Sequence, residues 1–240
     1  MTPSLVPTLS SVHAPAVDNC LTRNDWICGA YFSSSRVDAL QTALLQHIGI
    51  VVASVVLGFV IAFPLALLGR RYRKLEALVV GTSTAIYTIP SLALFSLLVP
   101  LTGLGVETVV LGLGLYSLTI LVRSMIDGLR AVPDDVRESA LGMGYAPARL
   151  LWRVELPLAL PTIMGGVRVA TVSAVALTTV GAILDYGGLG SLLIEGSSTN
   201  FKAQVLFTSF MCVALAVALD LLLVGLQRWL TPWRRTAASR

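Results

Sequence analysis

Side chains that perform covalent chemistry in proteins are sparse in this chain. Its histidines are His13 and His47, its lysines are Lys74 and Lys202, and no C-x-x-C, H-E-x-x-H or G-x-S-x-G pattern occurs. A phosphate-cradling loop of the form G-x-x-x-x-G-K-[ST] needs a lysine directly after a glycine, and neither lysine has one before it. We therefore expect no catalytic residue, no metal site and no cofactor, so that any ATP used must be bound and hydrolysed by another chain.

Two charged residues interrupt otherwise apolar stretches, where a charge is costly and therefore informative. Arg168 lies several residues after the start of one stretch, and Asp220 lies several residues before the end of another. Because a helix rises about 1.5 Å per residue, both side chains start about 10 Å inside the membrane. We predict that they form an ion pair that acts as a structural lock. The alternative is that each side chain extends separately to water.

Apolar residues dominate the composition. Hydrophobic residue types make up 55% of the 240 residues and charged types only 12%, which excludes an ordinary soluble domain with a charged surface. Stretches of roughly 18 apolar residues can cross a bilayer as a helix. Five such stretches occur, at 47–68, 77–101, 106–122, 161–184 and 204–226. The predicted fold class is all-α: a polytopic membrane protein with about five transmembrane helices.

The basic residues predict the orientation of the chain in the membrane. They follow the first stretch (70–74), lie between the third and fourth (123–153) and follow the fifth (228–240), so these regions should be cytoplasmic. The segment 185–203 contains Lys202 as its only basic residue and should face outward. A chain in the plasma or inner membrane, with its N-terminus outside and its C-terminus in the cytoplasm, satisfies every loop. The net charge of +4 is explained by orientation and does not indicate a nucleic-acid partner.

The chain divides into two polar tails and one membrane domain that contains a long loop. These segments are 1–45 (exported tail), 46–228 (membrane domain), 123–160 (cytoplasmic loop within it) and 229–240 (basic cytoplasmic tail). The first tail lacks the charged start and apolar centre of a signal peptide. Its Cys20 and Cys28 would lie in an oxidising compartment, where they either form a disulfide or remain two thiols.

The loop 123–160 has a helical pattern. Asp134 or Asp135 can cap a helix, with Glu138 completing a capping box. Glycines end this short helix, and Pro147 suits the first turn of a second one. We predict a helix–turn–helix unit on the cytoplasmic side, which either docks on a partner or merely connects two spans.

The spacing of residues within this loop is distinctive. It reads Glu138-Ser139-Ala140, three residues, Gly144, nine residues, Val154, one residue and Leu156-Pro157. This resembles the cytoplasmic signature of binding-protein-dependent ABC importer permeases, E-A-A-x3-G-x9-I-x-L-P, with Ser139 and Val154 as the departures. The segments 89–105, 154–168 and 187–190 look like the osmoprotectant branch of these importers, which carries glycine betaine, choline or carnitine.

The resemblance implies a non-catalytic transport subunit that forms the path for a quaternary ammonium osmoprotectant. Its implied partners are cytoplasmic ATPase subunits, a second permease copy or a paralogous permease, an extracytoplasmic solute-binding protein and membrane lipid. In the family the signature forms a coupling helix, which docks on the ATPase. The resemblance implies this docking role for Asp135, Glu138, Ser139, Ala140, Gly144, Val154, Leu156 and Pro157. Two alternatives are an ABC permease for an amino acid or other small polar solute, and an ion-coupled secondary carrier using Asp220.

Other residues are candidates for the solute path or its outer opening. Tyr87 could offer an aromatic face to a quaternary ammonium ion, although aromatic residues in membrane helices are more often packing residues. Pro90 should bend the second span. The outward segment could receive solute or a binding protein, or its glycines could simply form a re-entrant turn. Its candidate residues are Asp185, Gly187, Gly188 and Gly190.

Overall fold

The structure of the chain is a computed structural model that describes residues 20–32 and 34–233. Within these ranges every regular element is a helix, as the apolar composition predicts. The elements are η1 (Gly29–Tyr31), α1 (Ser34–Arg71), α2 (Arg73–Thr88), α3 (Ser91–Thr102), α4 (Val106–Arg130), α5 (Asp134–Gly142), α6 (Pro147–Leu150), the π-helical turn η2 (Leu151–Glu155), α7 (Leu156–Thr178), η3 (Thr179–Leu184), α8 (Leu189–Ser198) and α9 (Lys202–Leu230).

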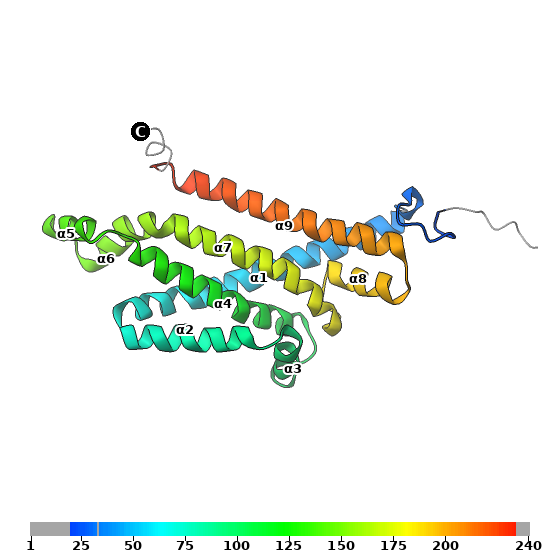
Figure 1. Cartoon of the computed structure of the whole chain (residues 1–240), viewed down its shortest axis with the longest axis horizontal. Coiled ribbons are helices and arrows are strands. Elements are labelled where there is room, and N and C mark those ends of the chain that lie inside the picture. Colours follow the sequence, from blue (N-terminus) through cyan, green and yellow to red (C-terminus); the bar gives the residue numbers. More distant parts are fainter. Residues whose placement is uncertain (1–19, 33, 234–240) are drawn as a thin grey trace, which may run out of the picture.

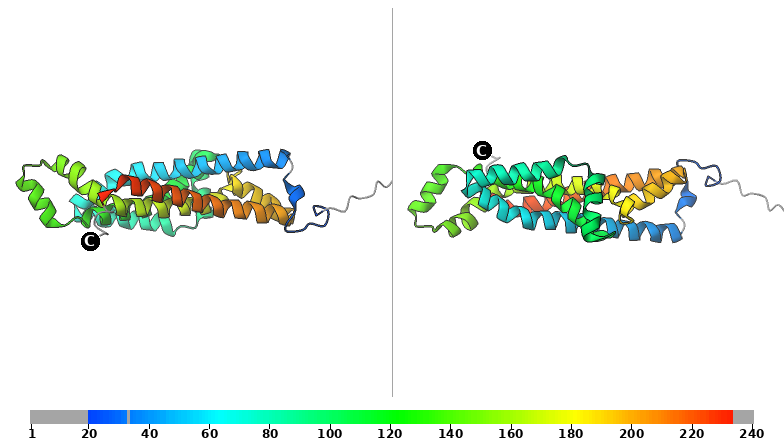
Figure 2. Two further views of the ribbon diagram at one scale, coloured as in Figure 1. Left: turned by 90° about the horizontal axis from the view of Figure 1, so that it is seen from above. Right: turned by 90° about the horizontal axis from the view of Figure 1, so that it is seen from below.

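The helices form an elongated bundle (Figure 1). Among the described residues, four helices are long and apolar enough to cross a membrane, and α2 with α3 adds a fifth crossing if the pair is one span, bent by 102°. The prediction of about five spans is thus confirmed. The segment around η1 lies at one end of the bundle, whereas α5, α6 and the C-terminal end of α9 lie toward the other (Figure 2). An odd number of crossings requires this separation.

The helix α4 is the centre of the bundle. In its most apolar window 67% of the residues are buried, against 6% in that of α9. Small residues let its neighbours approach closely: a Cβ added at Gly58 of α1 would lie 2.9 Å from the carbonyl oxygen of Gly114. On the other side of α4, a Cβ at Gly166 of α7 would overlap the Ser124 hydroxyl. The close contacts of α1, α4 and α7 therefore depend on glycine.

Two element boundaries differ from the sequence prediction. Helix α1 begins at Ser34, within the predicted tail, and the candidate span that it forms runs from Arg36 to Arg71. The fourth span is part of a helical run from Pro147 to Leu184, so the loop joins it without a break. Pro157 lacks the N–H that an α-helical bond to Arg153 would need, and directly before it the chain makes a π-type bond from the Leu156 N–H to the Leu151 carbonyl.

A disulfide between Cys20 and Cys28 closes the segment before α1, which resolves the alternatives left open for these cysteines. Tyr31 is buried beneath it, with its ring stacked on that of Phe207 at 5.6 Å. Burial raises the pKa of Tyr31 above its ordinary value. Asn24 bridges to the far end of the chain, accepting from the Lys202 N–H at 3.0 Å. The segment is thus fixed on the first turn of α9.

Candidate functional site

Within the predicted loop 123–160, the first separate helix is α5, whose first turn carries two aspartates. The N-cap residue is Pro133, and no side chain caps the helix. The predicted capping box of Asp135 and Glu138 is therefore wrong: the carboxylate of Asp135 instead accepts from the N–H of Val136 at 2.9 Å. Because Pro133 occupies the cap, both aspartates fall inside the helix, where their charges still complement the positive end of its dipole.

The end of α5 is fixed by Gly144. This residue has φ +82°, the left-handed conformation that side chains rarely adopt. The N–H of Tyr145 donates to the Ala140 carbonyl at 3.1 Å and that of Gly144 to the Leu141 carbonyl at 2.9 Å. This pair of bonds is a Schellman motif, which reverses the chain within a few residues. Gly144 thus has a conformational role that an L-residue would fill only with strain.

The faces of α5 differ in exposure. Ala140 is buried, whereas Glu138 and Ser139 are exposed. Leu141 and Met143 are also largely exposed. Large exposed apolar side chains beside polar ones are typical of a surface that a partner covers. Further along the loop, Val154, Leu156 and Pro157 are partly buried where the chain turns into α7.

A buried glutamate joins the loop to the spans. The side chain of Glu155, 2% exposed, accepts hydrogen bonds from two guanidinium nitrogens of Arg70, at the end of α1. It also accepts from Nε of Arg137, on α5, at 3.0 Å. The Arg137 guanidinium in turn donates to Asp134 at 2.8 Å and to the backbone carbonyl of Leu129 in α4. We call this set, Arg70, Leu129, Asp134, Arg137 and Glu155, the Glu155 cluster.

Sequence reasoning missed the Glu155 cluster. Glu155 occupies an unspecified position of the signature, which gave no reason to single it out. A signal was present, since Glu155 is the only acidic residue between Glu138 and Asp185. The nearest arginines in sequence, Arg149 and Arg153, are exposed instead of paired with it.

The structure brings Arg168 and Asp220 together. Nε of Arg168 donates to one oxygen of Asp220 at 2.7 Å and an Nη to the other at 2.8 Å. The bond is bidentate and links α7 to α9. The most apolar window of α9 is only 6% buried, less than that of any other candidate span. The ion pair with Arg168 is therefore an important polar contact between α9 and the bundle.

The break between α2 and α3 lies at Pro90, where the sequence predicted a bend. The hydroxyl of Tyr116 in α4 donates to the Ile89 carbonyl, which the break leaves without a helical partner. The exposed ring of Tyr87 meets the ring of Tyr116 edge to face at 5.6 Å. Tyr87 thus packs on α4, and any role in the solute path stays a prediction.

The glycines of 185–190 form a tight turn. Asp185 and Gly188 have positive φ values of 63° and 54°. A Cβ at Gly187 would lie 2.4 Å from the Ala182 nitrogen, and one at Gly190 would lie 2.4 Å from the Thr179 carbonyl oxygen. The residues therefore let the chain reverse between η3 and α8 against the spans. The role of this turn as an entry point for solute or a binding protein stays a prediction.

Together these features define a class of protein: a multi-pass helical membrane protein whose long loop between α4 and α7 is held against the spans by the Glu155 cluster. In the part of the chain that the structure describes, no three or more His, Cys, Asp or Glu side chains come together as a metal site would require.

The chain belongs to the family of binding-protein-dependent transport system inner membrane components, whose sequence profile matches residues 42–236. It is 36% identical, over 86% of its length and 90% of the relative's, to the glycine betaine/carnitine/choline transport system permease protein OpuCD of Bacillus subtilis. It is 38% identical to the osmoprotectant import permease protein OsmW of Salmonella typhimurium, over 80% of this chain and 92% of that one. Among solved structures, an inward-facing MetNI methionine ABC transporter chain matches with a TM-score of 0.73 at 21% identity, covering 83% of this chain and 99% of that chain. This last likeness concerns the fold alone.

Proposed function

We propose that the chain forms the membrane path for a quaternary ammonium osmoprotectant, such as glycine betaine, choline or carnitine. The observation that carries this proposal is the identity of 36–38%, over at least 80% of the chain, to permeases named for glycine betaine, carnitine and choline, for choline, or for osmoprotectant import. Transport is driven by ATP that separate cytoplasmic subunits bind and hydrolyse. A second permease copy or a paralogue completes the path, and an external solute-binding protein delivers the solute.

The loop around α5 is the proposed docking element for the ATPase. Its support is the exposed face of Glu138, Ser139, Leu141 and Met143, on a helix that the Glu155 cluster ties to α1, α4 and α7. A helix held in this way passes the movement of its partner to the spans as a rigid-body displacement. The Arg168–Asp220 pair serves as the lock that keeps α9 in register with α7 during this movement.

The proposed orientation has the N-terminus outside and the C-terminus in the cytoplasm. The Cys20–Cys28 disulfide supports it, because such bonds persist in oxidising compartments. A membrane-impermeant maleimide added to intact cells should label a cysteine introduced at Trp26, in a variant with Cys20 and Cys28 replaced by serine. It should not label one introduced at Met143. Labelling of Met143→Cys alone would reverse the assignment.

The substrate proposal is tested by uptake of radiolabelled glycine betaine, choline and carnitine into cells with and without this gene. The strain should lack other osmoprotectant importers. We expect ATP-dependent uptake of at least one compound, lost in the deletion. Uptake that survives ATP depletion while the proton gradient is kept would indicate a secondary carrier. Uptake of an amino acid in place of all three compounds would favour the other ABC permease branch.

A further inference from the structure

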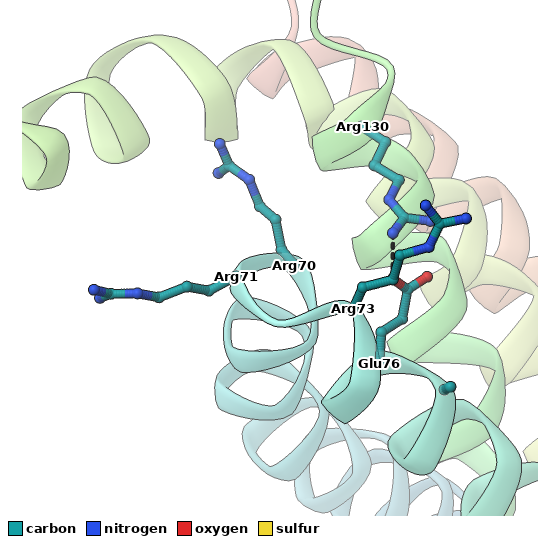
Figure 3. Close-up of a pocket in the computed structure, with 6 residues that line it drawn as sticks. Arg70, Arg71, Arg73, Glu76 and Arg130 are labelled. Atoms are coloured by element: carbon teal, nitrogen blue, oxygen red, sulfur yellow. Dashed lines mark hydrogen bonds and ion pairs between the residues drawn. The ribbon is translucent and has the colours of Figure 1, made fainter.

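The last turns of α4 carry three charged residues, Arg123, Asp127 and Arg130, and all three are exposed. Arg130 pairs with Glu76 near the start of α2 (Figure 3). Among the described residues, Arg123 has no carboxylate within ion-pair distance, and Asp127 is not paired with it. One guanidinium nitrogen of Arg123 donates to the hydroxyl of Thr84 in α2 at 2.8 Å.

The guanidinium of Arg123 points toward the middle of the span. Arg123 lies seven residues before the end of α4, about 10 Å along the helix. Thr119, one turn further from that end, donates its hydroxyl to the Ser83 carbonyl at 2.6 Å. Because Arg123 bonds to Thr84, the next residue of α2, its guanidinium lies at about the level of Thr119. This follows the lean of helical side chains toward the N-terminus, whereas a side chain that extends to the nearer membrane surface would point the other way.

The depth of this charge indicates what its face of the chain meets. A guanidinium inside a membrane is costly in lipid and normally faces protein or a water-filled cavity. One turn to either side of Thr84, the exposed residues of α2 are Gly81 and Thr88, in place of the large apolar side chains that suit lipid. We therefore expect this face of α2 and α4 to line a water-accessible space in the assembled transporter.

Two groups on this face match the two ends of one kind of solute. The guanidinium fork of Arg123 suits a carboxylate, and its bond to Thr84 uses only one of its donors. Tyr87 follows Thr84 by three residues, about 4.5 Å along α2, and its exposed ring packs on Tyr116, two turns before Arg123 in α4. An exposed aromatic ring is a favourable contact for a quaternary ammonium group.

We propose that Arg123 binds the carboxylate of the transported solute and that the ring of Tyr87 receives its ammonium group. This inference rests on the proposed function and narrows its substrate class. The path favours quaternary ammonium carboxylates, such as glycine betaine and carnitine, over choline, which is a cation without a carboxylate and is repelled by Arg123.

The first experiment needs no transport. A cysteine replaces Thr88 in a chain with Cys212→Ser, and membranes containing this chain and the other importer subunits are treated with an anionic or a cationic water-soluble methanethiosulfonate. Both reagents should label Thr88→Cys. Arg123→Gln should lower the ratio of the anionic to the cationic labelling rate roughly fivefold, the effect of one charge acting through water on reagents of opposite sign about one helical turn away. Arg149→Gln, which removes an exposed arginine of α6, should leave the ratio unchanged.

Two labelling results would overturn the proposal. Absence of labelling would mean that lipid or the second permease copy covers this face. A ratio that Arg123→Gln leaves unchanged, or that Arg149→Gln lowers equally, would mean that the charge of Arg123 does not act there. If Arg123→Gln does not reach the membrane, Arg123→Met removes the same charge with an apolar side chain of similar length.

The second experiment compares the maximal uptake rates of glycine betaine, carnitine and choline. Without the guanidinium the carboxylate passes this face unpaired, so Arg123→Gln should lower the rates for glycine betaine and carnitine about tenfold relative to that for choline. Arg123→Lys, which keeps the charge, should retain most of the preference, and Arg149→Gln all of it.

The uptake results separate this inference from the proposed function. An unchanged ratio in Arg123→Gln, or import of choline alone by the wild type, would overturn the inference and leave the proposed function intact. Import of none of the three compounds would refute the proposed function and this substrate class with it, even if labelling shows that the face attracts anions.

Discussion

Replacing Glu155 by glutamine should release α5 from the spans without unfolding them. Glutamine keeps the shape and one acceptor oxygen but removes the charge that Arg70 and Arg137 share. Removing one partner of a fully buried ion pair costs about 3–5 kcal/mol. Here the two arginine side chains are 27% and 22% exposed, so water can partly replace the lost carboxylate. We therefore expect roughly 2 kcal/mol, near the usual contribution of a hydrogen bond to a charged group.

The loss should fall on α5 because little else holds it. Ala140 is the buried residue of that helix, whereas α1, α4 and α7 share a large apolar core. Local opening of α5 would become easier by the same free energy, which speeds amide hydrogen exchange over 134–142 about thirtyfold. Exchange in α4 should not change. The measurement is hydrogen exchange of the purified chain, followed by mass spectrometry of its peptides.

Glu138→Gln is the matched control, because it makes the same chemical change on the exposed face of α5. It should leave exchange over 134–142 at the wild-type rate. Unchanged exchange in Glu155→Gln, or equal acceleration in the control, would refute the view that the Glu155 cluster holds the loop.

Three further changes test other contacts. Gly144→Ala forces an alanine to φ +82° at a cost of about 1 kcal/mol and should lower ATP-dependent uptake, whereas Gly142→Ala, with open space around its Cβ, should not. Exchanging the charges of Arg168 and Asp220 together should restore the uptake that either single reversal loses, and failure to restore it would count against the pair as a lock. Gly190→Ala places a Cβ 2.4 Å from backbone atoms and should reduce the amount of folded protein in the membrane, as measured by size-exclusion chromatography; a normal yield would show that the turn can shift.

The sequence predicted those parts of the structure that depend on local pattern and on the membrane. Apolar stretches and basic loops indicate helices and their number because lipid leaves the backbone few other choices. Contacts between distant segments were harder to predict. Arg168 and Asp220 could be paired only because charged residues are rare inside membrane spans. Glu155 and Arg70 are separated by 85 residues, and both lie near arginines and carboxylates that offered equally good partners in the sequence. The cap of α5 was misplaced for a local reason, since Pro133 competes with the aspartates for that position.

The segment closed by the disulfide has a consequence for the order in which the protein is assembled. Cys20 and Cys28 are 8 residues apart, so in the proposed orientation their bond can form as soon as this segment has reached the outer side of the membrane. The hydrogen bond from Asn24 to the Asn200 carbonyl joins residues 176 apart and has no partner until the ribosome has made α8. A loop closed at that stage stays without this partner while the intervening spans are inserted. Its contacts with Asn200 and Lys202 can form only after α8 and the start of α9 have been made, so a segment that can close early docks late.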